Sequence, residues 1–311
     1  MQLFNFSQPL HFMRFKWPAL LLSVLLVIGS IGSFATKGIN WGLDFTGGTV
    51  IEVGLNQSAD LTAMRDTLSA AGYPDAVIQL FGSSKDVLIR IPLRPDLVQE
   101  KVGEAVLQAL NAKQSTPVEL RRVEFVGPSV GEELKQDGGM AMLVALIGIL
   151  LYVALRFEWR LSVGAVVSLG HDVILTLGLF SILQLEFDLT VLAAILALIG
   201  YSINDTIVVF DRLRESFRKL REATVDETID HAITSTLNRT VITSLTTVLV
   251  LLVLFFMGGA LINGFATALL FGIAVGTYSS VYVASAIAEV LGISREDMLP
   301  APPAENEVEQ V

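Results

Sequence analysis

The chain has 311 residues, of which 52% are hydrophobic and 17% are charged, and its mean hydropathy is +0.63. This composition is too apolar for an ordinary soluble domain and indicates membrane spans. The formal net charge of −10 argues against a nucleic-acid partner. Because the chain contains no cysteine, a disulfide framework and a cysteine-ligated metal site are excluded.

Six apolar runs are each long enough, at roughly 20 residues, to cross a bilayer as a helix. The first follows Arg14 and Lys16 like a signal peptide, but its length and the five later runs favour an uncleaved anchor. We therefore predict a polytopic α-helical membrane protein with six transmembrane helices. The runs cover residues 17–36, 139–156, 161–183, 189–210, 236–257 and 264–288.

Basic residues in the short connections predict the orientation of these helices. The connections at 184–188 and 258–263 contain no Lys or Arg. The alternation places both termini in the cytoplasm and the long segment after the first helix outside. The basic connections carry Arg14, Lys16, Arg156, Arg160, Arg212, Arg214, Arg218, Lys219 and Arg221.

The long outer segment reads as short alternating elements. The order β-α-β-β-α-β is that of a ferredoxin-like sandwich, so we predict an extracytoplasmic ferredoxin-like α+β domain inserted between the first and second helices. It contains no catalytic constellation, nucleotide loop or HExxH motif, and we predict no enzymatic activity, no cofactor and no metal. The predicted strands are 48–55, 76–81, 86–92 and 118–126, and the helices are 60–73 and 95–111.

These elements divide the chain into four parts. Residues 1–36 form the cytoplasmic N-terminus and first helix, and residues 37–137 form the periplasmic domain. Residues 138–290 hold helices two to six, with an amphipathic segment near 212–233 on the inner membrane surface. The Pro- and Glu-rich segment 291–311 is a cytoplasmic tail that we expect to be disordered.

An Asn204–Asp205 pair interrupts the fourth apolar run. A charged side chain at bilayer depth costs at least roughly 2.5–3.5 kcal/mol, so it requires a reason. Asp205 lies six residues before Asp211, roughly 9 Å inward along a helix. With the fifth helix beginning near Thr234, Arg239 lies at a similar depth. The two form either a structural ion pair or a proton site, and chemistry alone leaves both readings open.

His171 and Asp172 lie near the middle of the third run. Adjacent helical residues point about 100° apart, so both cannot face one partner. Hydrogen bonds to neighbouring helices are the favoured reading for His171, whereas Asp172 is a candidate second carboxylate of a relay. The flanking residues lack the motifs of an intramembrane aspartyl protease, which disfavours that activity. Gly272 and Gly276 form a GxxxG motif typical of helix packing.

Several motifs together resemble the SecF family, the smaller membrane subunit of the accessory complex of the bacterial Sec translocon. This family belongs to the resistance-nodulation-division (RND) exporters, whose cores contain twelve helices in two similar halves. The motifs are "LDFTGGT" at 43–49, "GPSVGEEL" at 127–134, "FEWRLSVGAVVSLGHDV" at 157–173, "GYSINDTIVVFDRLRE" at 200–215, "LNRTVITSLTT" at 237–247 and "FGIAVGTYSSVYVA" at 271–284.

The resemblance implies an inner-membrane subunit that uses the proton-motive force to complete protein export. SecD would supply the other six helices, and SecYEG, YajC, the SecA motor, the translocating preprotein and lipid would be wider partners. It also implies that Asp205 and Arg239 belong to a proton path. Asp172, Asn204 and His171 are candidate relay or supporting residues. The domain junction would flex at hinge or junction residues Asp44, Gly47, Gly48, Gly127, Pro128 and Gly131.

Two other functions remain open at this stage. A proton-coupled exporter of small molecules or lipids in the same superfamily would require a complete twelve-helix chain and a larger outer domain. A passive scaffold of the translocon would make Asp205 a member of a structural ion pair. Substitution of Asp205 separates the scaffold from a proton-driven subunit.

Overall fold

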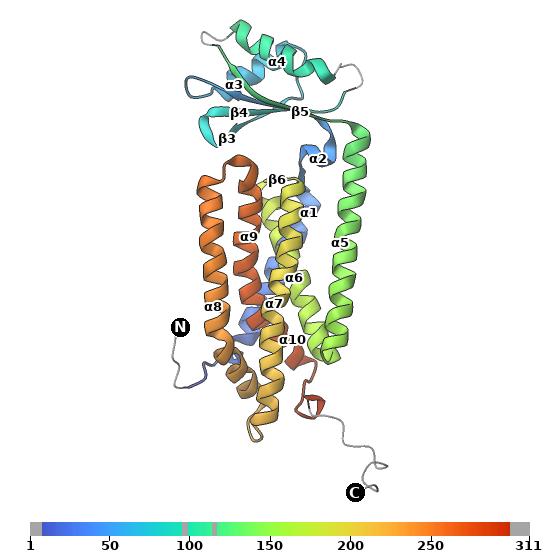
Figure 1. Cartoon of the computed structure of the whole chain (residues 1–311), viewed down its shortest axis with the longest axis vertical. Coiled ribbons are helices and arrows are strands. Elements are labelled where there is room, and N and C mark those ends of the chain that lie inside the picture. Colours follow the sequence, from blue (N-terminus) through green and yellow to red (C-terminus); the bar gives the residue numbers. More distant parts are fainter. Residues whose placement is uncertain (1–7, 95–98, 114–116, 299–311) are drawn as a thin grey trace.

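The computed structural model describes residues 8–94, 99–113 and 117–298. It consists of a bundle of long helices with a small α/β unit stacked on one end of the bundle (Figure 1). The described N-terminal segment and the connection between α7 and α8 lie at the opposite end of the bundle. The predicted tail from residue 299 onward lies outside the described residues.

Six helical segments in the described residues are long and apolar enough to cross a membrane, which confirms the six predicted spans. A short 3-10 turn precedes the first, and the last passes through five residues of π-helix. The segments are α1 (Lys16–Lys37), α5 (Pro128–Arg156), α6 (Trp159–Leu183), α7 (Leu189–Lys219), α8 (Val225–Met257), and α9 (Ala260–Ser279) continued by the π segment Ser280–Ala284 and α10 (Ser285–Val290).

Helix α5 begins before the boundary predicted at residue 138. Gly127 is its N-cap and Pro128 occupies the first turn, where the missing N–H of proline costs nothing. Charged residues between 132 and 137 lower the hydropathy of this stretch, although they are compatible with a helix. The helix therefore extends beyond the apolar run that revealed it.

The range 212–233, where we predicted an amphipathic segment on the inner membrane surface, is occupied almost entirely by the end of α7 and the start of α8. Helix α7 continues to Lys219, and α8 begins at Val225 rather than near Thr234. Thr224 and Glu227 form a capping box, with the Thr224 amide donating to Glu227 Oε2 at 2.8 Å. This sequence pattern marks a helix start.

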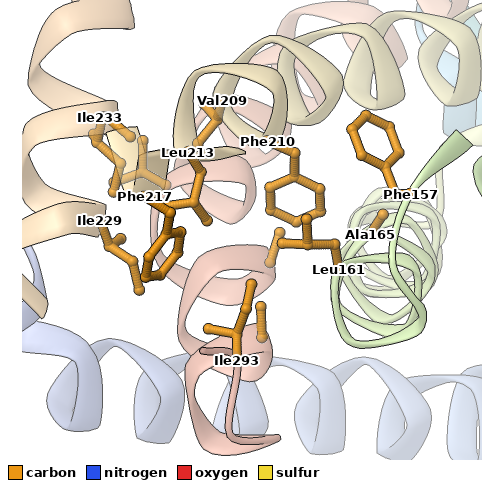
Figure 2. Close-up of a cluster of buried hydrophobic side chains, with 14 of the residues drawn as sticks. Phe157, Leu161, Ala165, Val209, Phe210, Leu213, Phe217, Ile229, Ile233 and Ile293 are labelled. Atoms are coloured by element: carbon orange, nitrogen blue, oxygen red, sulfur yellow. The ribbon is translucent and has the colours of Figure 1, made fainter. Parts of the chain in front are cut away.

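The apolar residues of this range point into the bundle. Leu213, Phe217 and Ile229 are buried in one cluster with Phe210 and Ile293 (Figure 2). Leu213 and Phe217 are four residues apart on α7, the spacing that predicts an amphipathic helix, and protein covers these side chains. This cluster joins α7, α8 and the last helix into one packed unit.

The α/β unit contains four strands and two helices in the order β-α-β-β-α-β. The sheet order is β3-β4-β2-β5 and every neighbouring pair is antiparallel. Both helices cover the face of the sheet that points away from the bundle (Figure 1). The elements are β2 (Gly48–Gly54), α3 (Leu61–Ala70), β3 (Val77–Phe81), β4 (Ser83–Ile91), α4 (Gln99–Lys113) and β5 (Glu119–Val126).

Local sequence signals explain the two helices of this unit. Asp60 caps α3 by accepting hydrogen bonds from the amides of Thr62 and Ala63, both at 3.0 Å, as its position predicts. Gly72 follows α3 with a φ of 96°, which favours glycine. The predicted start of the second helix at 95–98 lies outside the described residues. Along α4, the apolar face is buried at Val102, Val106 and Leu110.

A small junction connects the α/β unit to the bundle. Strand β1 (Asn40–Trp41) pairs in parallel with β6 (Glu186–Phe187), which lies between α6 and α7. The one-turn helix α2 (Leu43–Thr46) follows, and Phe45 packs with the rings of Trp41 and Phe187. The junction therefore places the α/β unit directly beside the first turn of α7.

Candidate functional site

Helix α7 is fixed at the end that faces the α/β unit. Asp188 is its N-cap and accepts the Val191 amide at 2.8 Å. Asp44 Oδ2, from α2, accepts the Leu189 amide at 2.9 Å. Two carboxylates therefore satisfy free N–H groups at the positive end of the helix dipole. One of them belongs to the segment that leads into the sheet.

Asp205 lies on the buried face of α7, three residues after Ser202, and only 4% of its surface is exposed. Its neighbours on α8 are the Thr240 hydroxyl, which hydrogen-bonds it, and the Arg239 guanidinium, which interacts with it electrostatically. Within the described ranges, Asp205 Oδ2 has no hydrogen-bond partner. A buried carboxylate with an unpaired oxygen is costly, because most buried polar atoms are hydrogen-bonded.

Asp205 and Arg239 lie on facing helices, but the described residues show no ion pair between them within 4.0 Å. Arg239 is an exposed residue of α8, and Asn204 is exposed on α7. Asp205 therefore points into the bundle, whereas Arg239 and Asn204 lie at the surface of the bundle. The sequence predicted that Asp205 and Arg239 have a similar depth; it could not predict that they face different surroundings.

Asp172 on α6 is completely buried and joins three helices. Its Oδ2 accepts the hydroxyls of Ser202 on α7 at 2.5 Å and Ser279 on α9 at 2.7 Å. Its Oδ1 lies 2.9 Å from Nδ1 of the adjacent His171, whose ring stacks at a tilt near Tyr278. Asp172 thus has the hydrogen-bond partners that Asp205 lacks, and His171 contacts Asp172 and a neighbouring helix.

Sequence reasoning missed the hydroxyl groups around both carboxylates. Ser202, Ser279 and Thr240 are common residue types in membrane helices, and their contacts are remote in sequence. One indirect signal is the GxxxG motif of α9. A Cβ on Gly272 would lie 2.4 Å from Leu198 Cδ2, and one on Gly276 would lie 3.3 Å from Ser202 Oγ. The motif is therefore a packing face, as predicted, and it lets Ser202 approach Asp172.

The predicted hinge residues meet in a tight junction. A Cβ on Gly48 would lie 2.5 Å from the Ile91 carbonyl oxygen, and one on Gly131 would lie 3.2 Å from the Gly47 amide nitrogen. Gly47 and Gly48 have φ angles of 67° and 128°, where glycine is favoured. The glycines thus allow the backbones before the sheet and at the start of α5 to approach closely, and Gly127 and Pro128 begin α5.

A second polar contact connects the sheet to the start of α7. Arg90 on β4 forms an ion pair with Glu186 and donates to the Trp41 carbonyl oxygen at 3.0 Å. Burial raises the pKa of the Glu186 carboxyl above its usual value, while the Arg90 charge opposes that rise. The α/β unit is therefore connected to the adjacent end of the bundle through both Asp44 and Glu186.

The candidate site is built around two carboxyl groups, a chemical type that can bind and release protons. Asp205 and Asp172 are buried carboxylates in helices that are apolar enough to span a membrane. In the described part of the chain, no three His, Asp or Glu side chains converge as a metal site requires. The fold and the site together define a polytopic helical membrane protein with carboxylates inside its helix bundle.

Comparison with known proteins identifies the family. Residues 106–294 match the family described as protein export membrane protein SecD/SecF, C-terminal. Residues 32–59 match the SecD/SecF GG motif, which covers the junction glycines Gly47 and Gly48. The first match alone covers more than half of the chain.

Curated relatives are similar along nearly their whole length. A protein translocase subunit SecF from Vibrio alginolyticus is 53% identical over 299 residues, covering 96% of this chain and 95% of the relative. A protein of the same name from Escherichia coli O157:H7 is 48% identical over 289 residues, covering 93% of this chain and 90% of the relative. The chain therefore belongs to the SecF family, and it is a multi-pass protein of the inner membrane.

Solved structures of longer relatives share the fold. A crystal structure of SecDF, described as a translocon-associated membrane protein from Thermus thermophilus, has a TM-score of 0.82 and 38% identity over 92% of this chain. A SecDF crystal structure in a super-membrane-facing form has a TM-score of 0.70 and 38% identity over 93% of this chain. This chain spans 39% of the length of each of those SecDF chains.

Proposed function

We propose that this protein is an accessory subunit of the Sec translocase that uses the proton-motive force to complete protein export. Its curated relatives are named protein translocase subunits, and the SecDF of similar fold is described as translocon-associated. These names support a role in export. The use of protons rests on the chemistry of Asp205.

The state of Asp205 is the single observation that carries the proton-site proposal. A structural ion pair at this depth would require direct contact with a cation and satisfied oxygens. Asp205 instead has an unpaired Oδ2 in the described residues, and Arg239 interacts with it only electrostatically. A carboxylate held in this way has room to gain and lose a proton, and Arg239 can bias that equilibrium by moving.

The outer end of α7 provides a route from this site to the α/β unit. Asp205 lies on the helix whose first amide is capped by Asp44, and Arg90 of the sheet pairs with Glu186 just before that helix. One elementary charge crossing 100 mV yields about 2.3 kcal/mol, so a few protons per cycle could reorient the α/β unit. The tightly packed junction at Gly47, Gly48 and Gly131 transmits such a movement in this proposal.

We also propose SecD as the partner that covers the exposed faces of the bundle. Arg239 is exposed on a membrane helix, where an uncovered guanidinium is expensive. Helices α5 and α8 also expose large apolar side chains, including Leu151, Leu155 and Phe256. The longer SecDF chains of similar fold support a second set of helices at this surface. SecYEG, YajC, SecA, preprotein and lipid complete the proposed environment.

The α/β unit has the strand order of a ferredoxin-like fold, and we propose that it lies in the periplasm with both termini in the cytoplasm. The basic residues Arg156 and Arg212 at the opposite end support this orientation. Single-cysteine variants test it, because the natural chain contains no cysteine. A cysteine replacing exposed Ser84 should react with an impermeant maleimide in intact cells, whereas one replacing exposed Glu222 should react only after permeabilisation. The reverse pattern contradicts the proposal.

Asp205→Asn tests the function directly. Asparagine is nearly isosteric with aspartate and can keep a hydrogen bond with Thr240, but it cannot be titrated. Complex abundance should remain near normal, and the ATP-driven step should survive. Uncoupler-sensitive release of preprotein from membrane vesicles should be lost. Ala197→Ser, a change at an exposed position two turns earlier on the same helix, is the control for local disturbance of α7.

Two outcomes of the Asp205→Asn experiment would contradict the proposal, and they lead to different conclusions. Normal abundance with normal uncoupler-sensitive release would show that Asp205 is not the proton site. Loss of abundance together with activity would favour the scaffold function, because removing one partner of a buried ion pair destabilises a protein by about 3–5 kcal/mol. Abundance by pull-down and release with and without an uncoupler therefore have to be measured on the same vesicles.

A further inference from the structure

Besides the surroundings of Asp205 and Arg239, the bundle contains a second group of buried polar residues, which lies between α6 and the last helix. Asp172, Ser168 and Gly164 follow one another at intervals of four residues on α6 and therefore share one face of the helix. Asp172 accepts the Ser279 hydroxyl of the last helix at 2.7 Å. A Cβ on Gly164 would lie 2.5 Å from the Ala284 carbonyl oxygen of the same helix. Ser168 therefore faces the last helix between these two contacts.

The last helix presents hydroxyl groups along the same stretch. Ser279, Ser280 and Ser285 have exposures of 0%, 1% and 0%. Ser280 Oγ lies 2.9 Å from the Thr206 hydroxyl of α7, and Ser285 Oγ donates to the Ser280 carbonyl oxygen at 3.2 Å. The helix is in the π conformation from Ser280 to Ala284, an irregularity that is frequent at functional sites.

We call the line of polar groups between α6 and the last helix, from Asp172 to Glu289, the column. Unpaired polar atoms lie at its start, middle and end. Among the described residues, His171 Nε2, Ser168 Oγ and Glu289 Oε2 are buried without a hydrogen-bond partner. His171 is 5% exposed and Ser168 is 1% exposed. Buried polar atoms are normally hydrogen-bonded, and water supplies the partner where the protein does not. Water is therefore the expected partner of each of these three atoms, two of which lie on α6 and one on α10.

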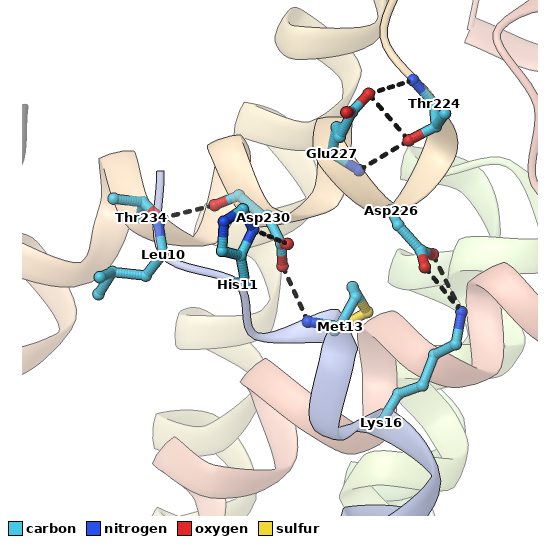
Figure 3. Close-up of polar contacts among 9 residues, drawn as sticks. All are labelled: Leu10, His11, Met13, Lys16, Thr224, Asp226, Glu227, Asp230 and Thr234. Atoms are coloured by element: carbon cyan, nitrogen blue, oxygen red, sulfur yellow. Dashed lines mark hydrogen bonds and ion pairs between the residues drawn. The ribbon is translucent and has the colours of Figure 1, made fainter. Parts of the chain in front are cut away.

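The column ends at the face of the bundle opposite the α/β unit. Ten residues separate Ser279 from Glu289, a rise of about 15 Å. Glu289 Oε1 lies 2.5 Å from Lys16 Nζ. Lys16 also contacts both Asp226 oxygens at 3.0 Å (Figure 3). The Asp226 side chain is 45% exposed. Charged groups therefore connect the lower end of the column to the surface.

We propose that this column is a hydrated pathway that carries protons between Asp172 and the surface near Glu289. Each hydroxyl or water accepts one proton and donates another, so no other reactant is needed. The charged or titratable groups along it are Asp172, His171, Glu289, Lys16 and Asp226. Ser202 contacts Asp172 and lies one helical turn before Asp205, which places the pathway beside the proposed proton site. The pathway's role in export rests on that proposed function, whereas its hydration does not.

The reactivity of an introduced cysteine tests whether the column contains water. This chain has no cysteine, so Ser168→Cys introduces a single thiol into this subunit, and the change is nearly isosteric. Leu169→Cys is the matched control, because Leu169 is its neighbour along the helix and is buried in an apolar cluster. Methanethiosulfonate ethylammonium, applied to the full complex in inverted membrane vesicles, reacts with thiolate, which apolar surroundings disfavour. Ser168→Cys should react at least about tenfold faster than Leu169→Cys. Equal rates would overturn the proposal.

Measurements of proton uptake test whether the column conducts protons. The double variant Ser168→Ala with Ser280→Ala removes two hydroxyls of the column and leaves Asp205 and Asp172 in place. We expect proton uptake by reconstituted complex to fall at least about tenfold, because two hydrogen-bonding steps are lost. Ser181→Ala, which removes a buried hydroxyl at the other end of α6, is the control and should leave uptake unchanged. Complex abundance is measured for every variant.

The outcomes separate this pathway from the function on which it rests. Unchanged proton uptake in the double variant would overturn the pathway, even if Asp205→Asn abolishes uncoupler-sensitive release. If Asp205→Asn leaves release intact, Asp205 is not the proton site, but the comparison of Ser168→Cys with Leu169→Cys still decides whether the column is hydrated. Reactive Ser168→Cys together with reduced uptake in the double variant supports the pathway.

Discussion

The core of the α/β unit and the core of the helix bundle are built from different residues. The core of the unit is a cluster of apolar side chains between the sheet and its two helices, including Ile51, Ile89 and Val106. The bundle also has apolar clusters, but it buries carboxylates and many hydroxyls at bilayer depth, among them Asp172, Asp205 and Ser279. Each polar group there must find a partner or remain costly.

This difference indicates which part of the molecule can change its packing when a proton binds. An apolar core with antiparallel strand pairs has one good packing arrangement, so the α/β unit can move as a rigid body. A bundle whose helices meet through Asp172, Ser202 and Ser279 has interactions that depend on protonation and on hydrogen-bond geometry. The following predictions test this division between a rigid unit and a bundle with polar contacts.

The largest effect on stability is expected from a substitution in the apolar core of the α/β unit. A fragment of residues 40–130 should fold alone, with a mixed α/β circular dichroism spectrum and a cooperative thermal transition. Ile89→Ala should lower its free energy of unfolding by about 2–5 kcal/mol, because a fully buried side chain leaves a cavity. Lys85→Ala, at an exposed position, should change it by less than about 0.5 kcal/mol. A disordered fragment would show that the unit depends on the bundle or a partner.

Substitutions of Asp172 test how much the buried polar contacts of the bundle contribute to its stability. Asp172→Leu leaves the Ser202 hydroxyl and His171 Nδ1 without their partner, whereas Ser279 can still donate to the Gly276 carbonyl oxygen at 3.1 Å. Each unsatisfied buried group costs about 1–3 kcal/mol. The thermal stability of the detergent-solubilised complex should fall clearly. Asp172→Asn should have a smaller effect, since its amide oxygen still accepts both hydroxyls. Equal stability of both variants and the natural protein would mean that these hydrogen bonds contribute nothing to packing.

Glycine packing within the bundle should have an intermediate effect. Gly272→Ala places a methyl group 2.4 Å from Leu198 Cδ2, which should cost about 1–3 kcal/mol of stability. Gly170→Ala is the matched control, because no atom lies within 4 Å of its added Cβ. It should be neutral or stabilising by up to about 1 kcal/mol, as expected for alanine in a helix. Identical melting temperatures for the two variants would refute the close α7–α9 contact.

The sequence predicted the elements of the fold better than the contacts of the site. Hydropathy revealed six spans, and Asp60 marked the start of α3. Charged residues concealed the first turns of α5, even though Pro128 marks a helix start. The capping box at Thr224 likewise marked the start of α8 more accurately than the apolar run did.

The site was predicted only in part, for a physical reason. Charges at bilayer depth are rare, so Asp205, Arg239 and Asp172 could be found from the sequence. Their partners could not, because Ser202 and Ser279 are ordinary residues that reach Asp172 across 30 and 107 positions of the chain. Tertiary packing decides which hydroxyl meets which carboxylate.

The smallest expected effect concerns the contact between the two regions. Burial raises the pKa of Glu186, and Arg90 only partly opposes it, so the folded protein binds this proton more tightly than the unfolded chain. The ionised form therefore costs stability above the folded pKa. That cost disappears as the pH falls through the folded pKa toward the unfolded value of 4.5. The natural protein should gain stability over that window, relative to a variant that cannot titrate at this position.

Glu186→Gln isolates this contribution. The melting temperature of the natural complex minus that of the variant should increase as the pH is lowered from 8 toward 5, by no more than about 2–4 °C for roughly 1 kcal/mol. Glu222→Gln, at an exposed position, controls for the general response of the complex to acid. A difference that stays constant with pH would mean that water reaches Glu186 freely. The contact with Arg90 would then be a solvated ion pair, and the α/β unit would rest on the bundle chiefly through Asp44 and the packed glycines.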